Sequence, residues 1–388
     1  MDFHLAKRAQ VAPFLAMEIL REANMMEAQG ETIFHMEIGQ PAHSLPDAVL
    51  ERIQHALQNE YLGYTNASGL PCLKQKITEH YQNEYGEDVA PEQIVITTGS
   101  SAGFLLAFIA TLNAGDKVGM PVPGYPAYRN IFHALDVETY DVYSHFHDSD
   151  EATESRLLDE CQKGIAEGIK RLLIASPSNP TGSIISPEGI SALVKNCEDN
   201  NIWFYSDEIY HGLAYDKQTK TAVNLSEKAI VINSFSKYFG MTGWRIGWLV
   251  VPEKLVKPIE YLAQSLYISP PTISQIAARE ALNTSSLFAE TKEYYKRNRD
   301  ILTSALDKAG IDYFPADGAF YVYANIAPSK LSSLVFSQKL LENQCVAVTP
   351  GVDFDTQYGQ DYIRLSYAGK PEMVAEATAR IIHFYQNC

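Results

Sequence analysis

Short apolar runs alternate along the chain with longer segments in which apolar residues recur every three or four positions. The short runs predict buried strands, and the periodic segments predict helices. The predicted strands cover residues 33–38, 94–97, 117–122, 137–143, 171–175, 202–205, 229–233, 248–251, 319–323, 346–348 and 362–367. The predicted helices cover residues 13–29, 46–58, 104–112, 157–165, 190–197, 253–266 and 331–343, and the stretch 274–304 is helix-prone.

The order of these elements predicts the fold class. From residue 91 onward a strand is repeatedly followed by a helix, which is typical of an α/β protein whose mostly parallel sheet carries helices on both faces. With 388 residues the chain exceeds one average domain. We therefore expect a large domain over residues 46–289 and a smaller α+β domain over residues 290–388, with residues 1–45 packing on the smaller domain. In the first helix, Phe14, Met17, Leu20 and Ala28 lie near helical spacing.

Composition and charge narrow the class of protein. Hydrophobic residues make up 46% of the chain, enough for a substantial core, and 31 basic against 47 acidic residues give a net charge of −16. Such a charge argues against nucleic acid or an anionic membrane as the main partner. No signal-peptide pattern is present, the longest apolar stretch (104–110) is too short to span a bilayer, and five cysteines are scattered without a C-x-x-C pair. We expect a cytoplasmic protein with reduced thiols.

A candidate catalytic lysine and a candidate phosphate-binding arginine both lie in the segment 234–247. This segment places Lys237 among four aromatic residues, namely Phe235, Tyr238, Phe239 and Trp244. A protonated lysine in such surroundings is costly unless its pKa falls or its nitrogen is bound covalently, as in a Schiff base. Arg245, eight residues further on, is a permanent cation suited to gripping a phosphate. A solvated surface lysine is the ordinary alternative when this context is set aside.

The pattern S-x-x-K, followed by this arginine, resembles the cofactor-lysine signature of fold-type I pyridoxal-phosphate (PLP) enzymes, specifically of class I/II aminotransferases similar to aspartate aminotransferase. The resemblance implies that Lys237 binds PLP as a Schiff base and that Ser234 and Arg245 hold its phosphate. It also implies a seven-stranded, mostly parallel sheet in the large domain. Matching motifs run in the expected order from Gly39 to Arg364 and so cover nearly the whole chain.

A loop of small residues, 98–103, lies between the strand 94–97 and an almost wholly apolar helix. A strand, such a loop and a helix N-terminus together form an anion site through free backbone amides and the helix dipole, although a plain turn is an equal alternative. Given Lys237 and Arg245, we interpret Ser101 and Ala102 as phosphate contacts. The loop matches neither G-x-G-x-x-G nor a Walker A sequence, which argues against a nucleotide site.

Three further motifs would hold the planar part of the cofactor. Tyr125 lies in the stiff loop P-G-Y-P, and the resemblance implies that its ring covers the pyridine. Asn179, in S-P-S-N-P, is implied to hydrogen-bond the phenolic oxygen and to contact substrate. Asp207 follows the strand 202–205, where open α/β sheets bind ligands, and suits a protonated pyridine nitrogen, although a helix cap is the alternative. Tyr210 is implied to hydrogen-bond the phenolic oxygen.

The remaining motifs concern the substrate and a second chain. Gly39 is either an ordinary turn glycine or, as the resemblance implies, a place where backbone approaches the substrate carboxylate and a side chain would block it. Arg364 lies in an apolar strand, where a charge is costly unless paired. It either forms an intramolecular ion pair or, as the R-x-S motif implies, takes the substrate α-carboxylate in a bidentate fork. Tyr64 is implied to reach the phosphate of a partner subunit, which makes the protein a homodimer with shared active sites.

The implied reaction is a ping-pong transfer of the amino group of an L-amino acid to a 2-oxo acid, with Lys237 as general base and acid. The nearest alternative is a PLP-dependent β-lyase on the same scaffold. A ligand-sensing regulator would normally carry a basic DNA-binding segment, and a dehydrogenase would carry the dinucleotide fingerprint; neither feature stands out.

Substrate choice stays open at this point. Some aspartate-using relatives place a lysine about where Ser101 stands, and the absence of an obvious substitute cation weakens an acidic substrate, although an arginine of the partner chain could serve. Neutral and aromatic amino acids remain open. We expect no metal site, because the H-x-H pair His145 and His147 lies at a polar strand end.

Overall fold

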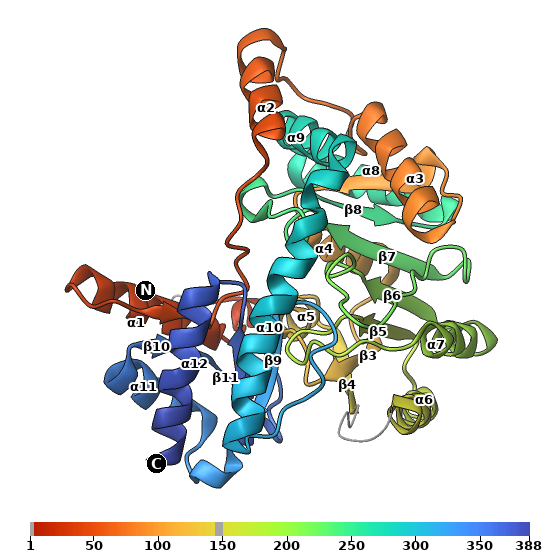
Figure 1. Ribbon diagram of the computed structural model, residues 1–388. Coiled ribbons are helices and arrows are strands. Elements are labelled where there is room, and N and C mark those ends of the chain that lie inside the picture. Colours follow the sequence, from red (N-terminus) through yellow and green to blue (C-terminus); the bar gives the residue numbers. More distant parts are fainter. Residues whose placement is uncertain (1–3, 144–149) are drawn as a thin grey trace.

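The computed structural model describes residues 4–143 and 150–388 (Figure 1). His145 and His147 therefore lie outside the described residues. A seven-stranded sheet has the order β2 (Ile94–Thr97), β8 (Gly247–Val250), β7 (Ala229–Ser234), β6 (Trp203–Asp207), β5 (Arg171–Ala175), β3 (Lys117–Val122) and β4 (Glu138–Tyr143). β8 is antiparallel to both of its neighbours, and all other pairs are parallel. The predicted mostly parallel α/β sheet is confirmed.

Helices cover both faces of this sheet, as alternate strand residues show. Ile94 and Ile96 belong to a core cluster with α3 (Pro71–Tyr85), α6 (Asp150–Ala166), α7 (Pro187–Asp199) and α9 (Thr272–Asn283). Val95, between them, belongs to a second cluster with α4 (Ser100–Thr111), α5 (Pro126–Ala134) and α8 (Glu253–Tyr267). Successive side chains of a strand point to opposite faces, so the near-continuous apolar runs reflect burial on both sides.

A smaller body of structure forms around a three-stranded antiparallel sheet of β11 (Thr349–Pro350), β12 (Tyr362–Ser366) and β9 (Tyr321–Asn325). It includes α11 (Ser333–Gln344) and α12 (Pro371–Gln386), and α12 packs on the long helix α10 (Ala289–Ala309). β1 (Phe34–His35) pairs in parallel with β10 (Val346–Ala347), which ties the N-terminal segment to this part. Figure 1 shows α1 (Leu15–Ala28) beside the blue C-terminal elements.

Several elements differ from the prediction. α4 begins at Ser100, so most of the expected loop 98–103 is the first turn of a helix. The apolar run 33–38 contains only the two-residue strand β1, and the stretch 274–304 is divided between α9 and α10. The helices α3, α5 and α12 are not among the predicted elements, although buried Leu73, Ile77 and Tyr81 in α3 recur every four residues.

The first helix also buries an unexpected face. Its buried residues are Ile19 and Ala23, which pack with Ile33, Leu341 and Ala347, whereas Met17 is 51% exposed. α1 rests on β10 and α11 through this narrow contact, so two small or branched side chains suffice to anchor it.

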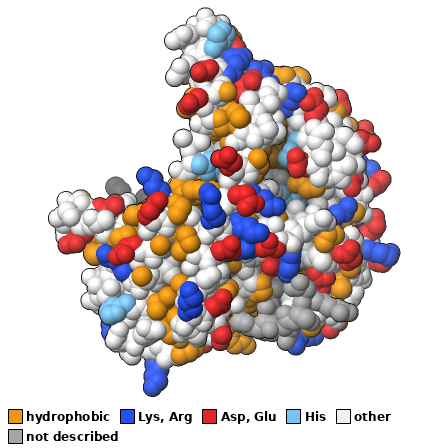
Figure 2. Space-filling view, in the orientation of Figure 1, with side chains coloured by type: hydrophobic (Ala, Val, Ile, Leu, Met, Phe, Trp, Pro, Cys, Tyr) orange, Lys and Arg blue, Asp and Glu red, His pale blue; other side chains and the backbone are white. Residues whose placement is uncertain are grey.

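α2 (Asp47–Asn59) projects from the body of the molecule, at the top of Figures 1 and 2. Within residues 4–143 and 150–388, no helix is both long and apolar enough to cross a bilayer.

Candidate active site

A cavity of about 300 Å³ lies where the carboxyl ends of β5 and β6, the first turn of α4 and the segment after β7 face β12. This volume is at the lower end of those typical of small-molecule sites. The predicted site residues that line it are Gly39, Ser101, Tyr125, Asn179, Asp207, Tyr210, Lys237, Arg245 and Arg364. Ala102, Ser234 and Tyr64 are not among its lining residues.

Lys237 extends into the cavity from the segment that follows β7. Its Nζ donates a hydrogen bond to the Gly39 carbonyl oxygen at 3.0 Å and lies 5.7 Å from the centre of the Phe320 ring. Burial lowers the pKa of Lys237 to about 8, and the nearby charges of Arg364 and Arg245 act in the same direction. A substantial fraction of the amine is therefore neutral, and so nucleophilic, near neutral pH.

Gly39 lies so close to two aromatic rings that a side chain at this position would clash with them. A Cβ on Gly39 would lie 1.8 Å from the Tyr321 hydroxyl oxygen and 2.9 Å from a ring carbon of Phe320. Only a glycine allows the backbone carbonyl to approach Lys237 so closely at this point.

Asp207 ends β6 and is held by two donors. One carboxylate oxygen accepts a hydrogen bond from the Ile209 backbone nitrogen at 3.1 Å, and the other accepts one from the Tyr128 hydroxyl. Burial raises the pKa of Asp207 to about 6, and the Tyr128 hydrogen bond opposes this rise. The carboxylate thus forms an anionic wall of the cavity, suited to a cationic ring nitrogen.

Arg364, in β12, faces Asp207 from the smaller sheet. Its Nη1 donates to the Asn179 Oδ1 at 3.0 Å, and its Nη2 donates to the Thr349 Oγ1 at 3.1 Å and to the Glu37 carbonyl. Its buried Nε has no acceptor among the described residues, and no described carboxylate lies within ion-pair distance of the guanidinium. The first alternative for Arg364, an ion pair within the chain, is therefore not observed among the described residues. An anionic ligand would supply the negative charge that the guanidinium lacks.

The part of the cavity at the N-terminus of α4 has features that favour binding of an anion. α4 starts here with Gly99 at its N-cap and without a capping side chain, so its first amides remain free for a ligand. A Cβ on Gly99 would lie 2.5 Å from the Arg245 Nη2, so glycine lets the guanidinium approach the helix end. Ser236 lines the cavity. The Ser234 hydroxyl does not, and it lies within hydrogen-bond distance of the Ser236 Oγ at 2.9 Å and of the Ile246 carbonyl oxygen at 3.2 Å, to either of which it can donate its one proton.

Comparison with known proteins agrees with this geometry. The family model described as "Aminotransferase class I and II" matches residues 31–381. The chain belongs to this family. It is 41% identical, over 98% of each chain, to a valine–pyruvate aminotransferase of Mycobacterium tuberculosis. The crystal structure of an aminotransferase from Mycobacterium tuberculosis matches 100% of both chains with a TM-score of 0.93 at 39% identity. The aspartate aminotransferase of Thermus thermophilus with maleate matches 99% of this chain and 100% of its own with a TM-score of 0.90 at 28% identity.

Class I and II aminotransferases use PLP, and the cavity of this aminotransferase suits that group. The free helix end and Arg245 match a phosphate, Asp207 matches the ring nitrogen, and the aromatic ring of Tyr125 also lines the wall. The close approaches at Gly39 and Gly99 and the unpartnered Nε of Arg364 are further marks of a ligand-binding cavity.

Tyr128 and Tyr321 are among the aromatic residues of this aminotransferase site that were not predicted. Tyr128 lies three residues after Tyr125, at the start of α5, and that helical spacing is the signal that would have pointed to it. Tyr321 lies in β9, and its hydroxyl is 3.0 Å from that of Tyr210. Nothing near Tyr321 in the sequence marks this contact, because it forms between the two sheets.

Tyr64 does not reach the cavity of its own chain and is 82% exposed. Among the residues that the structure describes, no group of three or more His, Cys, Asp or Glu side chains is arranged to hold a metal ion.

Proposed function

We propose that this aminotransferase moves the amino group of an L-amino acid to a 2-oxo acid in a ping-pong reaction, with Lys237 as the group that carries the proton. The observation that carries the proposal is the position of the Lys237 amine. It lines the same cavity as Arg364 and Asp207. The Nε of Arg364 has no acceptor among the described residues and would bind a carboxylate, and the Asp207 carboxylate would hold a cationic ring nitrogen.

Each predicted residue receives one task in this proposal. The N-terminus of α4 with Ser101 and Ala102, together with Ser236 and Arg245, would bind the phosphate of PLP. Ser234, whose hydroxyl lies 2.9 Å from the Ser236 Oγ, would act on the phosphate through Ser236. The other cofactor contacts would be Tyr125 on the ring face, Asn179 and Tyr210 at the phenolic oxygen, and Asp207 at the ring nitrogen. When bound, PLP supplies an electron sink that stabilises negative charge at the substrate Cα.

The chain itself binds, orients and moves a proton. Arg364 would hold the α-carboxylate, while the Gly39 carbonyl and the aromatic rings keep the Lys237 amine beside the Cα–H bond. Because the pKa of Lys237 is about 8, the amine can accept a proton and give it up again at ordinary pH, as a general base and acid must.

The test is the absorbance of the purified PLP-loaded protein before and after single L-amino acids are added without any oxo acid. Loss of the cofactor band in stoichiometric amount, with release of the matching 2-oxo acid, supports transamination. Release of ammonia and pyruvate would favour the β-lyase instead. Lys237→Ala should abolish the response, whereas Lys220→Ala, at a surface ion pair with Glu87, should leave it intact.

We also infer that the active enzyme is a homodimer whose sites are completed by Tyr64 of the second copy. α2 and the segment that follows it expose large apolar side chains, which we call the α2 patch, namely Leu50, Leu57, Tyr61, Leu62 and Tyr64. Tyr61 and Tyr64 are 94% and 82% exposed, which is unusual for neighbouring large aromatic side chains. Figure 2 shows this part projecting at the top of the molecule.

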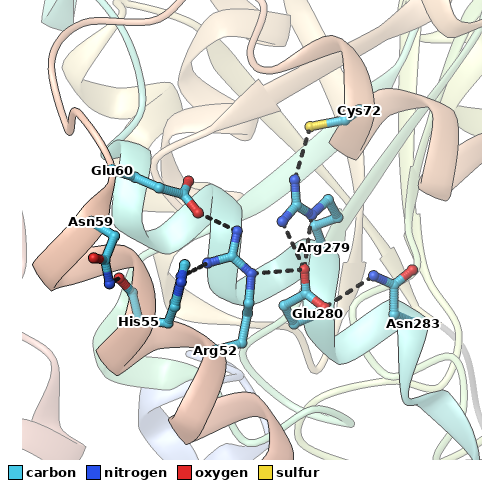
Figure 3. Close-up of polar contacts among 8 residues, drawn as sticks. All are labelled: Arg52, His55, Asn59, Glu60, Cys72, Arg279, Glu280 and Asn283. Carbon is cyan, nitrogen blue, oxygen red and sulfur yellow. Dashed lines mark hydrogen bonds and ion pairs between the residues drawn. The ribbon is translucent and has the colours of Figure 1, made fainter.

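A polar cluster holds the projecting helix in position (Figure 3). Arg52 in α2 pairs with Glu60 and, at 3.7 Å, with Glu280 in α9. Glu280 in turn pairs with Arg279 at 2.7 Å and accepts a hydrogen bond from Asn283. The α2 patch is thus fixed in place in the isolated chain, which favours a preformed interface.

Shared sites give a complementation test. Lys237→Ala and Tyr64→Ala should each lower activity alone, and mixing the two variants under conditions that exchange subunits should restore activity above both parents. One site of each mixed dimer would then contain both native residues. A monomer by analytical ultracentrifugation, or a mixture that never exceeds its parents, would contradict the shared site.

Two further expectations stay proposals. The division into residues 46–289 and 290–388 agrees with α10 starting at Ala289 and with the pairing of β1 and β10. A cytoplasmic location rests on the sequence alone, through the scattered cysteines and the net charge of −16.

A further inference from the structure

The first turn of α1 forms part of the wall of the cavity. Phe14, Ala16 and Met17 line it, although they are remote in sequence from the strands that carry the catalytic groups. The Phe14 ring stacks on that of Tyr125, with ring centres 6.1 Å apart and 6° between their planes. Since Ile19 and Ala23 supply the core contact of α1, Phe14 and Met17 are free to offer an apolar surface to a ligand.

Asp353 fixes this turn over the cavity. Its two carboxylate oxygens accept hydrogen bonds from the backbone nitrogens of Leu15 at 3.2 Å and Ala16 at 3.3 Å. The next residue, Phe354, packs on Arg364, whose guanidinium carbon is 4.8 Å from the centre of the ring. The wall beside the proposed carboxylate site therefore combines apolar side chains with two acidic residues, Glu37 and Asp353.

The positive charges of the cavity all have other tasks. Among the described residues that line it, the cations are Lys237, Arg245 and Arg364. In the proposed function they act on the Cα proton, the phosphate and the α-carboxylate. A second carboxylate on the substrate would therefore find no further cation among the described residues that line the cavity, and would approach the carboxylate of Asp353. Arg129, which opposes the raised pKa of Asp353, does not line the cavity.

We propose that the amino-acid substrate carries a neutral, apolar side chain that contacts Phe14, Met17 and Phe354, and that amino acids with an acidic side chain are discriminated against. The inference rests on the proposed function, because the side chain reaches this wall when the α-carboxylate lies on Arg364 and Cα lies beside Lys237. Desolvating an unpaired carboxylate is far more costly than burying an apolar group, so the expected preference is roughly 100-fold.

The experiment uses the PLP-loaded enzyme and measures the rate constant for loss of the cofactor band with L-leucine, L-valine, L-aspartate and L-glutamate. The expected ratio of apolar to acidic substrates is about 100 in second-order rate constant. An equal or faster reaction with L-aspartate overturns the substrate class and leaves transamination standing. No reaction with any amino acid overturns the proposed function instead.

A matched pair of variants tests the wall itself. Met17→Arg places a cation at the wall and is expected to raise the rate constant for L-aspartate about tenfold while lowering that for L-leucine. Met25→Arg, on the same helix and equally exposed but outside the cavity, should change neither. An unchanged ratio in Met17→Arg would overturn the contact.

Binding without turnover provides a second readout. The Kd values of 4-methylpentanoate and succinate, measured from their effect on the Tm of the PLP-loaded enzyme, should favour the apolar monocarboxylate. Met17→Arg should shift that preference towards succinate, and tighter binding of succinate to the native enzyme would overturn the proposal.

Discussion

Three buried groups in the cavity carry an electrostatic cost that a ligand would relieve. Burial lowers the pKa of Lys237 to about 8 and raises that of Asp207 to about 6, and the Nε of Arg364 has no acceptor in the described structure. Such groups cluster at functional sites because folding alone would select against them. In the proposed function, an anion at Arg364, a cation at Asp207 and an aldehyde at Lys237 would relieve these costs.

The pKa of Lys237 leads to a first prediction. Only the neutral amine attacks an aldehyde, and its fraction increases as pH rises through about 8, well below the ordinary value of 10.5. The rate of covalent PLP binding to the PLP-free protein should therefore rise with pH and level off above about pH 9. Stopped-flow absorbance measures this rate, and one that continues to climb steeply beyond pH 10 would contradict the lowered pKa.

A second prediction concerns Tyr128. Tyr128→Phe removes the hydrogen bond that opposes the raised pKa of Asp207, so the carboxyl group will protonate more readily and hold a cationic ring nitrogen less well. We expect the Kd of PLP to rise about tenfold, or ~1.4 kcal/mol, in an absorbance titration.

Tyr205→Phe is the matched control for Tyr128→Phe. Tyr205 is buried in β6, the strand that Asp207 ends, but its hydroxyl contacts the Thr111 hydroxyl rather than Asp207. Both variants should lower the Tm, and only Tyr128→Phe should weaken PLP binding. An equal change in Kd for the two would mean that general destabilisation, not the Asp207 contact, is responsible.

At this scale the sequence predicts those residues that belong to compact motifs. Tyr125, Asn179 and Asp207 each lie beside prolines or at the end of a strand, and the structure brings all three to the cavity. Tyr128 and Tyr321 were missed because their importance arises from partners 79 and 111 residues away.

Two helix starts show how elements are fitted to the site. α1 has no cap from its own N-cap residue, Phe14, and instead receives two carboxylate acceptors from Asp353. α4 starts at the cavity without a side-chain cap. One helix end is thus neutralised within the protein, whereas the other leaves its amides and the positive end of its dipole for an anionic ligand.

The α1 cap leads to a third prediction. Asp353→Ala removes both acceptors, so the amides of the first turn of α1 should exchange with solvent about tenfold faster, the effect of losing a typical cap. Hydrogen exchange followed by mass spectrometry measures this, with peptides from α12 as the internal reference. Asp353→Asn keeps one acceptor and should lie between the two proteins; unaltered exchange in Asp353→Ala would show that α1 is held by other contacts.

Strands were easier to predict than helices for a physical reason. A strand buried on both faces needs an apolar residue at nearly every position, which β5 and β7 have. A surface helix needs apolar residues on one face only. In α1 the face that packs carries Ile19 and Ala23, and not the predicted Met17 and Leu20. Helix starts are harder still, because the first turn of α4 is made of small residues that also suit a loop.

On the scale of the molecule, the cavity joins two sheets. Asp207 ends a strand of the seven-stranded sheet and Arg364 belongs to the three-stranded one, so ligands spanning the cavity contact both. The repeated strand–helix order predicted the larger sheet. It did not reveal the antiparallel β8 or the pairing of β1 with β10, because long-range pairing leaves no local pattern.

This arrangement gives a fourth prediction. PLP at about 100 times its Kd should stabilise the protein by about 2.7 kcal/mol and raise the Tm by roughly 5 °C. Differential scanning fluorimetry measures the shift. Pyridoxal, which lacks the phosphate for Arg245 and the α4 end, should give a smaller one, and equal shifts with both compounds would exclude a contribution of the phosphate site.

The pairing of β1 with β10 also sets an order of events as the chain is made. Phe34 and His35 leave the ribosome on the order of half a minute before their partners Val346 and Ala347 exist. The seven strands from β2 to β8 are complete by residue 250 and can assemble in that interval. Gly39 and Arg364 meet only afterwards. If the residues have the proposed roles, the nascent enzyme thus acquires its cofactor-binding half first and its substrate-binding half last.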